Sequence, residues 1–260
     1  MKDTILLIED SSIQARIIAQ MFCTLTPFSV LVANSRAQAE DILVQQKEEL
    51  FVVVADLNLS DAPDGEAVDA CLAQGLPCIV LAASFDEKLR AKFLEKRVAD
   101  YFLKGSVDDL TPLVDAVCRL HANHNVTALV VDDSSTQRGV VKRMLGVQCI
   151  TCLEAPNGVV ALKMLQENPG IRLVITDFNM PQMDGIELVH RIRATYHINQ
   201  LAVIGLSSTG SGPLTAKFLK YGANDFLTKP FEAEEFYWRV NQTLNILEVM
   251  EELKQLRGRG

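Results

Sequence analysis

The chain has 260 residues, and 48% of them are apolar, enough to bury an ordinary core and too many for a disordered chain. Its 25 basic and 33 acidic residues leave a formal net charge of −8, which argues against a protein that coats nucleic acid or an anionic membrane. No apolar run approaches the ~18–20 residues of a membrane helix. We therefore expect a soluble cytoplasmic protein with no direct nucleic-acid or membrane partner.

Four segments of the first half recur in the second half, in the same order and at a nearly constant offset. The matched pairs are TILLIEDSS (4–12) with TALVVDDSS (127–135), LFVVVADLNL (50–59) with RLVITDFNM (172–180), LPCIVLAAS (76–84) with QLAVIGLSS (200–208), and ADYFLKG (99–105) with NDFLTKP (224–230). Such self-similarity is typical of a duplicated domain. It predicts one domain over residues 1–122, a second over 126–245 and a helical extension over 246–260.

Each half alternates short apolar strands with amphipathic helices. In the second half we expect strands at about 127–131, 149–154, 171–176, 201–206 and 224–227, and helices at about 134–146, 157–168, 185–195, 212–221 and from 232 onward. Continuous apolar strands are typical of a parallel sheet covered on both faces. The pattern predicts an α/β protein with two doubly wound, five-stranded parallel sheets and an extended C-terminal helix.

Charged and hydroxyl side chains follow the strands of the second half. Asp132 and Asp133 come directly after the first strand, Asp177 ends the third, Ser207 ends the fourth and Lys229 follows the fifth. Because ligands of a doubly wound sheet bind beyond the carboxyl ends of its strands, these side chains should converge on one site. Clustered carboxylates need positive charge beside them, and Mg²⁺ prefers oxygen ligands. A carboxylate can also act as a nucleophile toward phosphorus and form an aspartyl phosphate.

The second half resembles the receiver domain of two-component response regulators. The resemblance covers nearly all of 126–245 and rests on the segments VVDDSS, EAPNGVVAL, ITDFNMPQMDGIEL, IGLSS and GANDFLTKPF. It implies a flavodoxin-like, CheY-like fold. It also implies that Asp177 accepts a phosphoryl group from a histidine kinase or a phosphotransfer protein, and that Asp132, Asp133 and Asp177 hold Mg²⁺ together with the backbone carbonyl of Asn179.

The same resemblance assigns the residues that respond to the phosphoryl group. Ser207 and Lys229 would contact it, and Phe226, three residues before the lysine, falls at the family's aromatic switch position. In that family the hydroxyl residue moves toward the phosphate and the aromatic side chain turns inward behind it. A lysine followed by a proline, here Pro230, is a further family feature, and this bond is often cis.

The first half repeats the acidic part of this pattern. Glu9 and Asp10 replace the Asp pair, Asp56 matches the phosphoacceptor and Asn58 follows it by two residues. By resemblance these four residues form a second Mg²⁺ site. Asp56 is then a second candidate phosphoacceptor.

The hydroxyl of the second half has no equivalent in the first. Lys104 and Tyr101 match the lysine and the aromatic switch, but the hydroxyl position is Ala82, which cannot hydrogen-bond a phosphoryl group. We interpret the first half as a modified receiver that acts as a regulatory or second phosphoacceptor domain. The alternative is an interaction scaffold that works without phosphorylation.

Apolar residues continue at helical spacing beyond the second repeat. Ile246, Val249, Leu253 and Leu256 are spaced 3, 4 and 3 residues apart, as in the seam of a coiled coil, although two heptads make only a short one. Either a long final helix carries a partly exposed stripe, or the helix pairs in a dimer or leads to an effector domain that this chain does not contain. We expect any homodimer to form through the second receiver or this helix.

Two enzyme classes fit the sequence less well than a signalling receiver. An Asp-nucleophile phosphohydrolase would place its nucleophile after the first strand, with a second Asp two residues on, whereas here the candidate nucleophile ends the third strand. A dinucleotide-binding oxidoreductase needs a glycine-rich turn after the first strand, and both first strands are followed by acidic residues. We expect no enzyme activity beyond self-catalysed phosphoryl transfer to the aspartate and its slow hydrolysis.

Overall fold

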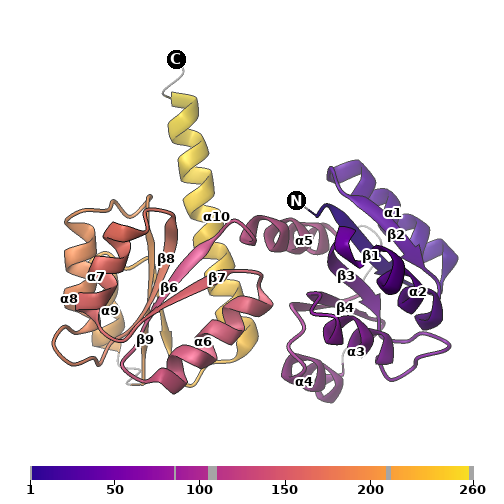
Figure 1. Cartoon of the computed structure of the whole chain (residues 1–260), viewed down its shortest axis with the longest axis horizontal. Coiled ribbons are helices and arrows are strands. Elements are labelled where there is room, and N and C mark those ends of the chain that lie inside the picture. The colour runs from indigo at the N-terminus through magenta and orange to yellow at the C-terminus, as the bar shows by residue number, and fades with distance from the viewer. Residues whose placement is uncertain (1, 85, 105–109, 209–211, 258–260) are drawn as a thin grey trace. The chain divides into compact units, whose positions relative to one another are not determined.

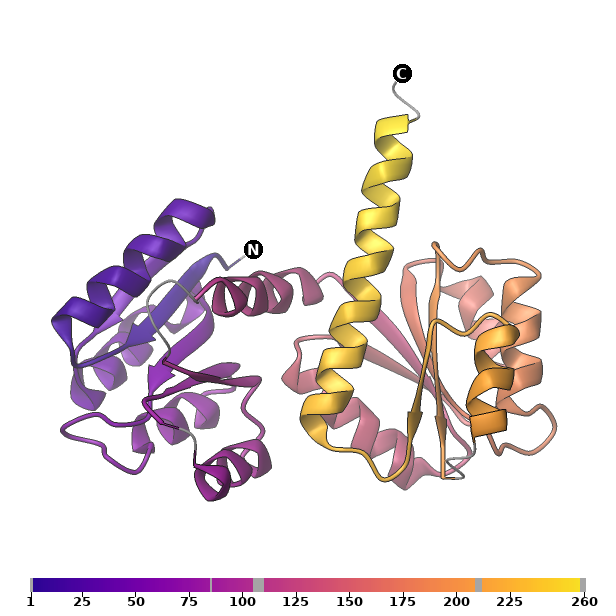
Figure 2. The same ribbon diagram turned by 180° about the vertical axis from the view of Figure 1, so that it is seen from behind.

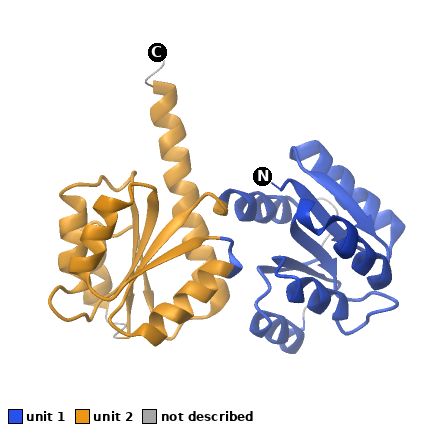
Figure 3. Ribbon diagram, in the orientation of Figure 1, with its two compact units in different colours: residues 1–122, 147–149 blue, residues 123–146, 150–260 orange. Residues whose placement is uncertain are grey.

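The computed structural model describes residues 2–84, 86–104, 110–208 and 212–257. It divides into two compact units, residues 1–122 with 147–149 and residues 123–146 with 150–260 (Figure 3). Each unit contains one five-stranded sheet in which every pair of neighbouring strands is parallel. Both sheets and the long final helix confirm the predicted fold class.

The first unit alternates strands and helices through the whole repeat (Figure 1). Its elements are β1 (Thr4–Ile8), α1 (Ser12–Leu25), β2 (Ser29–Ala33), α2 (Arg36–Gln46), the 3₁₀ turn Lys47–Glu49, β3 (Leu50–Asp56), α3 (Glu66–Ala73), β4 (Cys78–Ala82), α4 (Glu87–Glu95), β5 (Asp100–Leu103) and α5 (Thr111–Asn123). The strand order is β2-β1-β3-β4-β5. Side chains of α2, α3 and α4 pack on one face of this sheet, and those of α1 and α5 on the other.

The second unit repeats this plan. Its elements are β6 (Thr127–Val131), α6 (Ser135–Val147), β7 (Thr151–Ala155), α7 (Gly158–Glu167), β8 (Ile171–Asp177), α8 (Gly185–Arg193), β9 (Ala202–Ser207), α9 (Gly212–Lys220), β10 (Asp225–Thr228) and α10 (Ala233–Arg257). The strand order β7-β6-β8-β9-β10 is the same as in the first unit. Strand β7 begins two residues later than predicted, because Cys149 adopts a left-handed backbone with φ of 62°.

Helix α10 runs beside the second sheet over its first half and extends beyond it over its second half (Figure 2). Its buried side chains are Phe236, Tyr237, Val240, Thr243, Leu244 and Leu247. From Ile246 onward the predicted apolar stripe is exposed, including Leu253 and Leu256. Residues 258–260 of the predicted extension lie outside the described residues. None of the described helices has the length and apolarity that a membrane span requires.

Candidate functional site

Lys229 joins two carboxylates at the carboxyl edge of the second sheet. Its Nζ lies 2.7 Å from Asp177 Oδ1 and 3.0 Å from Asp132 Oδ2. Strand β8 positions Asp177 as its last residue, and Asp132 follows β6 directly. The two carboxylates are only 12% and 6% exposed. Burial lowers the pKa of Lys229, but hydrogen bonds and charge from Asp177 and Asp132 outweigh burial and raise it overall, so the lysine stays protonated and offsets the acidic cluster.

The remaining predicted residues surround this ion pair at different depths. Asp133 and Asn179 are exposed, and the Asn179 backbone N–H donates to Asp177 Oδ2 at 2.8 Å. Ser207 is fully buried at the end of β9. Phe226 is only 6% exposed, and the Lys229–Pro230 bond is cis. The structure therefore brings the predicted set to one sheet edge, with Asp133 at its surface.

Arg138 is a site residue that sequence patterns did not reveal. From the first turns of α6 its Nη1 donates to the carbonyl oxygen of Asp132 at 2.7 Å and reaches that of Asp133 at 3.4 Å. Its Nε lies 3.4 Å from Glu154. The available signal was its spacing, because it follows Asp133 by five residues, near the start of α6. Its hydrogen bonds to the acidic loop, however, go to backbone carbonyls, which no residue pattern encodes.

Lys104 has the same role in the first unit and binds more partners there. Its Nζ lies 2.6 Å from Glu9 Oε2 and 2.7 Å from Asp56 Oδ2, and it donates to Gln14 Oε1 at 3.0 Å. Glu9 is almost fully buried. Burial raises the pKa of Glu9, against hydrogen bonding and charge from Lys104 that lower it, and the negative charge of Asp56 adds to the rise. The carboxyl edge of this sheet is therefore an acidic cluster with one central cation.

The first unit holds the tighter carboxylate cluster. One oxygen each from Glu9, Asp10 and Asp56 lies within 4.8 Å of the others, and Asn58 N–H donates to Asp56 Oδ1 at 3.2 Å. Such a set of carboxylate oxygens fits the donor preference of Mg²⁺ and matches a receiver metal site. No such three-carboxylate group occurs elsewhere among the described residues. Asp132, Asp133 and Asp177, the predicted metal ligands of the second unit, do not form a group of this spacing in the structure.

Strand register identifies Ala82 as the equivalent of Ser207. Asp177 pairs with Leu206 and Asp56 pairs with Leu81, so the hydroxyl and the methyl group each follow the partner of the aspartate. Ser84, two residues beyond Ala82, is exposed. The first unit therefore has an alanine at the position of the hydroxyl, and Ser84 does not take its place.

Tyr101 differs from its counterpart Phe226 in its polar end. Its hydroxyl is buried and has no hydrogen-bond partner among the described residues. Burial raises the pKa of this phenol, the charge of Asp86 adds to the rise and Arg90 opposes it. The predicted switch aromatic of the first unit thus has a buried hydroxyl that Phe226 lacks.

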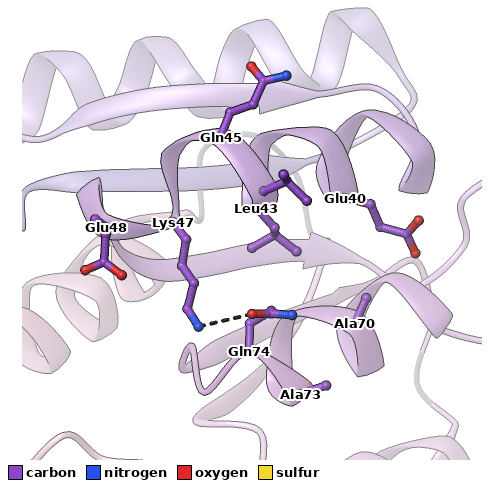
Figure 4. A pocket seen from close by; sticks show the side chains of 9 residues that line it. Glu40, Leu43, Gln45, Lys47, Glu48, Ala70, Ala73 and Gln74 are labelled. Carbon is purple, nitrogen blue, oxygen red and sulfur yellow. Dashed lines mark hydrogen bonds between the residues drawn. The ribbon is translucent and has the colours of Figure 1, made fainter.

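Two hollows on the described surface lie away from these acidic edges. One, of about 580 Å³, lies between the C-terminal parts of α2 and α3, where Lys47 donates to Gln74 at 3.1 Å (Figure 4). The other, of about 990 Å³, lies in the second unit between α10 and the loop before β9. Neither is lined by a residue of the predicted phosphorylation or metal sites.

Part of the chain is similar in sequence to known proteins. The model of the response regulator receiver domain matches residues 128–241. A chemotaxis protein CheY homolog of Campylobacter jejuni is 39% identical over 104 residues, which are 40% of this chain and 80% of that protein. The chemotaxis protein CheY1 of Helicobacter pylori is 39% identical over 106 residues, 40% of this chain and 84% of that protein.

A solved structure resembles almost the whole chain. It is described as a two-component system response regulator/GGDEF domain protein and is 40% identical, with a TM-score of 0.85 over 95% of this chain and 100% of that one. The chain belongs to the response regulator receiver family and contains two receiver domains, one in each unit.

Proposed function

We propose that the protein is a phosphorylation-controlled signalling module in which Asp177 is the phosphoacceptor. The observation that carries the proposal is the paired contact of Lys229 with Asp177 and Asp132 beside the buried Ser207. A cation and a hydroxyl next to a carboxylate at the carboxyl edge of a parallel sheet suit phosphoryl transfer. The residue ranges 1–122, 126–245 and 246–260 and the cytoplasmic location stay predictions of the sequence.

The reacting groups have distinct roles. A carboxylate oxygen of Asp177 attacks phosphorus, an O–P bond forms, and the bond to the imidazole nitrogen of a phosphohistidine breaks, leaving a neutral histidine after protonation. Lys229 offsets the negative charge and Ser207 donates a hydrogen bond to a phosphoryl oxygen. Mg²⁺, when bound by Asp132, Asp133, Asp177 and the Asn179 carbonyl, would neutralise charge on the phosphoryl oxygens.

Phosphorylation then alters the surface that partners read. The aspartyl phosphate carries about −1.5 to −2 charges in place of the −1 charge of the Asp177 carboxylate, and it brings new acceptor oxygens beside Ser207 and Lys229. We propose that this biases a two-state arrangement of α9 and β10, including Phe226, which a dimer or an effector recognises. The cognate donor is a histidine kinase or a phosphotransfer protein.

The first receiver has two candidate roles. The carboxylate spacing of Glu9, Asp10 and Asp56 and the contact of Lys104 with Asp56 support Mg²⁺ binding and phosphorylation of Asp56. Ala82 removes the hydroxyl that would link the phosphate to Tyr101, which supports a phosphorylation-independent regulatory scaffold. We propose that this domain binds metal and is only weakly coupled to phosphorylation.

A phosphodonor experiment tests these assignments. The full chain is incubated with Mg²⁺ and acetyl phosphate, and the modified residue is mapped by mass for the unaltered protein, Asp177→Asn and Asp56→Asn. The proposal expects modification of Asp177 and its loss in Asp177→Asn. Modification that persists undiminished at other residues in Asp177→Asn contradicts it. Equal rates and occupancies at Asp56 and Asp177 contradict the weaker role of the first receiver.

Helix α10 is the second partner surface. Ile246, Val249, Leu253 and Leu256 are between 45% and 68% exposed, a stripe that a second copy of the chain could cover. The relative described as a response regulator/GGDEF domain protein supports the alternative that α10 adjoins an effector domain. We propose that α10 carries the output of the second receiver to one of these two partners.

A further inference from the structure

Helix α9 buries one side chain fully against the second sheet. Phe218 is the buried residue of this nine-residue helix and is 0% exposed. Leu214 packs only partly against the same core, and Lys217, Leu219 and Lys220 face solvent. The position of α9 therefore depends mainly on where the Phe218 ring lies.

Two glycines make the space for this ring. A Cβ atom built at Gly205 on β9 would lie 2.7 Å from both Cδ1 and Cε1 of Phe218 and 3.1 Å from Cδ2 of Phe226. A Cβ atom at Gly185, the first residue of α8, would lie 3.0 Å from Cζ of Phe218 and would collide with the carbonyl oxygen of Asp177. Each of these separations is shorter than a normal carbon–carbon contact of about 3.5–4.0 Å, so the ring fills a slot that only glycines leave open.

The Phe218 ring contacts two other aromatic rings of the second unit. Phe178, the residue after Asp177, meets Phe218 edge to face with centroids 5.9 Å apart. The Phe226 ring meets it from β10 with centroids 5.3 Å apart. Phe226 also pairs in register with Gly205 on the neighbouring strand. One ring of α9 thus contacts the residue beside the phosphoacceptor and the predicted switch aromatic.

We propose that Phe218 is a positioning residue that couples Asp177 to α9. The inference rests on the proposed function of Asp177. Closely packed rings have no spare volume, so a shift of the Asp177–Phe178 backbone or of Phe226 must displace Phe218 and with it the helix. The packed rings transmit the change, and α9 is the element that moves because Phe218 is its one fully buried side chain.

The first receiver contains the same anchor with one contact changed. Phe93 is the buried residue of α4, and a Cβ atom at Gly65 would collide with its ring. At the strand position of Gly205, however, stands Val80, which pairs in register with Tyr101. Among the described residues, Phe93 and Tyr101 form no ring pair like that of Phe218 and Phe226. The first receiver therefore lacks the ring contact between its fourth helix and its switch aromatic that the second receiver has.

Hydrogen exchange of α9 in the full chain tests the coupling. Exchange is measured over residues 212–220 with Mg²⁺ alone and with Mg²⁺ and acetyl phosphate, while mass reports the phosphate on Asp177. In the unaltered chain phosphorylation should change the α9 exchange rate about fivefold or more, the lower end of ordinary coupling. In Phe218→Leu, Asp177 should still be phosphorylated but the response of α9 should be lost.

Matched variants separate coupling from folding. Gly205→Val introduces the residue of the first receiver and should also abolish the response of α9, whereas Leu219→Ala, at an exposed position of the same helix, should preserve it. If Phe218→Leu loses its folded circular dichroism spectrum, Phe218→Met takes its place. A response of α9 in Phe218→Leu or Phe218→Met equal to that of the unaltered chain overturns the coupling alone. Absence of phosphate from Asp177 in the unaltered chain overturns the proposed function as well.

Discussion

Ser207 and Ala82 occupy the same place in the two sheets, each directly after the strand partner of a candidate phosphoacceptor. Both are buried, and both precede the loop that leads to the fourth helix of their domain. The two receivers thus present the same backbone to a phosphoryl group, with a hydroxyl donor in one and a methyl group in the other. This difference at one position changes the chemistry expected of the two domains.

Removing the hydroxyl of Ser207 should weaken phosphorylation of the second receiver. We expect Ser207→Ala to slow modification of Asp177 by acetyl phosphate about tenfold or more, because one donor to the phosphoryl oxygens is lost. Time-resolved mass measurement gives the rate. Ser208→Ala, which alters the exposed neighbour, is the control and should leave the rate unchanged. An equal loss in both variants would mean that the loop, not the hydroxyl, is responsible.

Removing Lys229 should destabilise the second receiver and stop phosphorylation. Lys229→Met leaves Asp132 and Asp177 without their cation, which we expect to cost about 3 kcal/mol of unfolding free energy at pH 7. Because the pKa of Lys229 is raised in the folded state, its contribution should be complete below about pH 10 and be lost as the pH rises through that raised pKa. Urea unfolding across this range measures it. Lys217→Met, on the surface of α9, should have no comparable effect.

Asp100 should destabilise the first receiver at neutral pH, and this cost should disappear in acid. Burial raises the pKa of Asp100 to about 6, although a hydrogen bond from Tyr101 N–H lowers it, whereas the equivalent Asp225 is paired with Arg239 at 3.0 Å. An acid with a raised folded pKa opposes folding above that pKa and has no cost below its unfolded pKa of about 4. Asp100→Asn should therefore stabilise the domain by about 3 kcal/mol at pH 8 and by almost nothing at pH 3.5.

The control for this pH effect is Asp225→Asn. It removes an ion pair instead of an uncompensated charge, so it should lower stability at pH 8. Urea unfolding of both variants at the two pH values makes the comparison. A stabilisation by Asp100→Asn of the same size at pH 3.5 and pH 8 would show that packing, not ionisation, accounts for it.

Arg138 should hold the acidic loop of the second receiver in place. Its charged hydrogen bond to the Asp132 carbonyl should contribute about 1.5–3 kcal/mol, and Arg138→Ala should lose this and slow the phosphorylation of Asp177 at subsaturating Mg²⁺. Arg143→Ala, an exposed position of the same helix, is the matched control. Phosphorylation at the original rate in Arg138→Ala would limit the arginine to a role in stability.

Self-association through α10 should depend on its exposed apolar stripe. If a second copy covers this stripe, Leu253→Glu should weaken the dimer about tenfold, which corresponds to ~1.4 kcal/mol, while Asp177 is phosphorylated as before. Sedimentation velocity over a range of concentrations makes the measurement, and Gln255→Glu is the control. If the unaltered chain is a monomer at every concentration, the dimer is ruled out and an effector is the remaining partner of α10.

The repeats and the strand ends already determine most of the fold and the identity of the main site residues. Apolar runs at repeated spacing specify two parallel sheets, since such strands must be covered on both faces. Once the sheets are doubly wound, residues that follow the first, third, fourth and fifth strands have to meet at one edge. Asp132, Asp177 and Lys229 could therefore be placed together from their positions in the chain alone.

Tertiary structure decided the contacts that do not follow from strand order. Arg138 donates a hydrogen bond to a backbone carbonyl. Lys104 donates one to Gln14, whose position depends on the packing of α1. The slot for Phe218 requires Gly185 and Gly205, two glycines from different elements, to face one ring. Such contacts depend on side-chain rotamers and on packing between elements distant in sequence. A pattern of residue types carries neither.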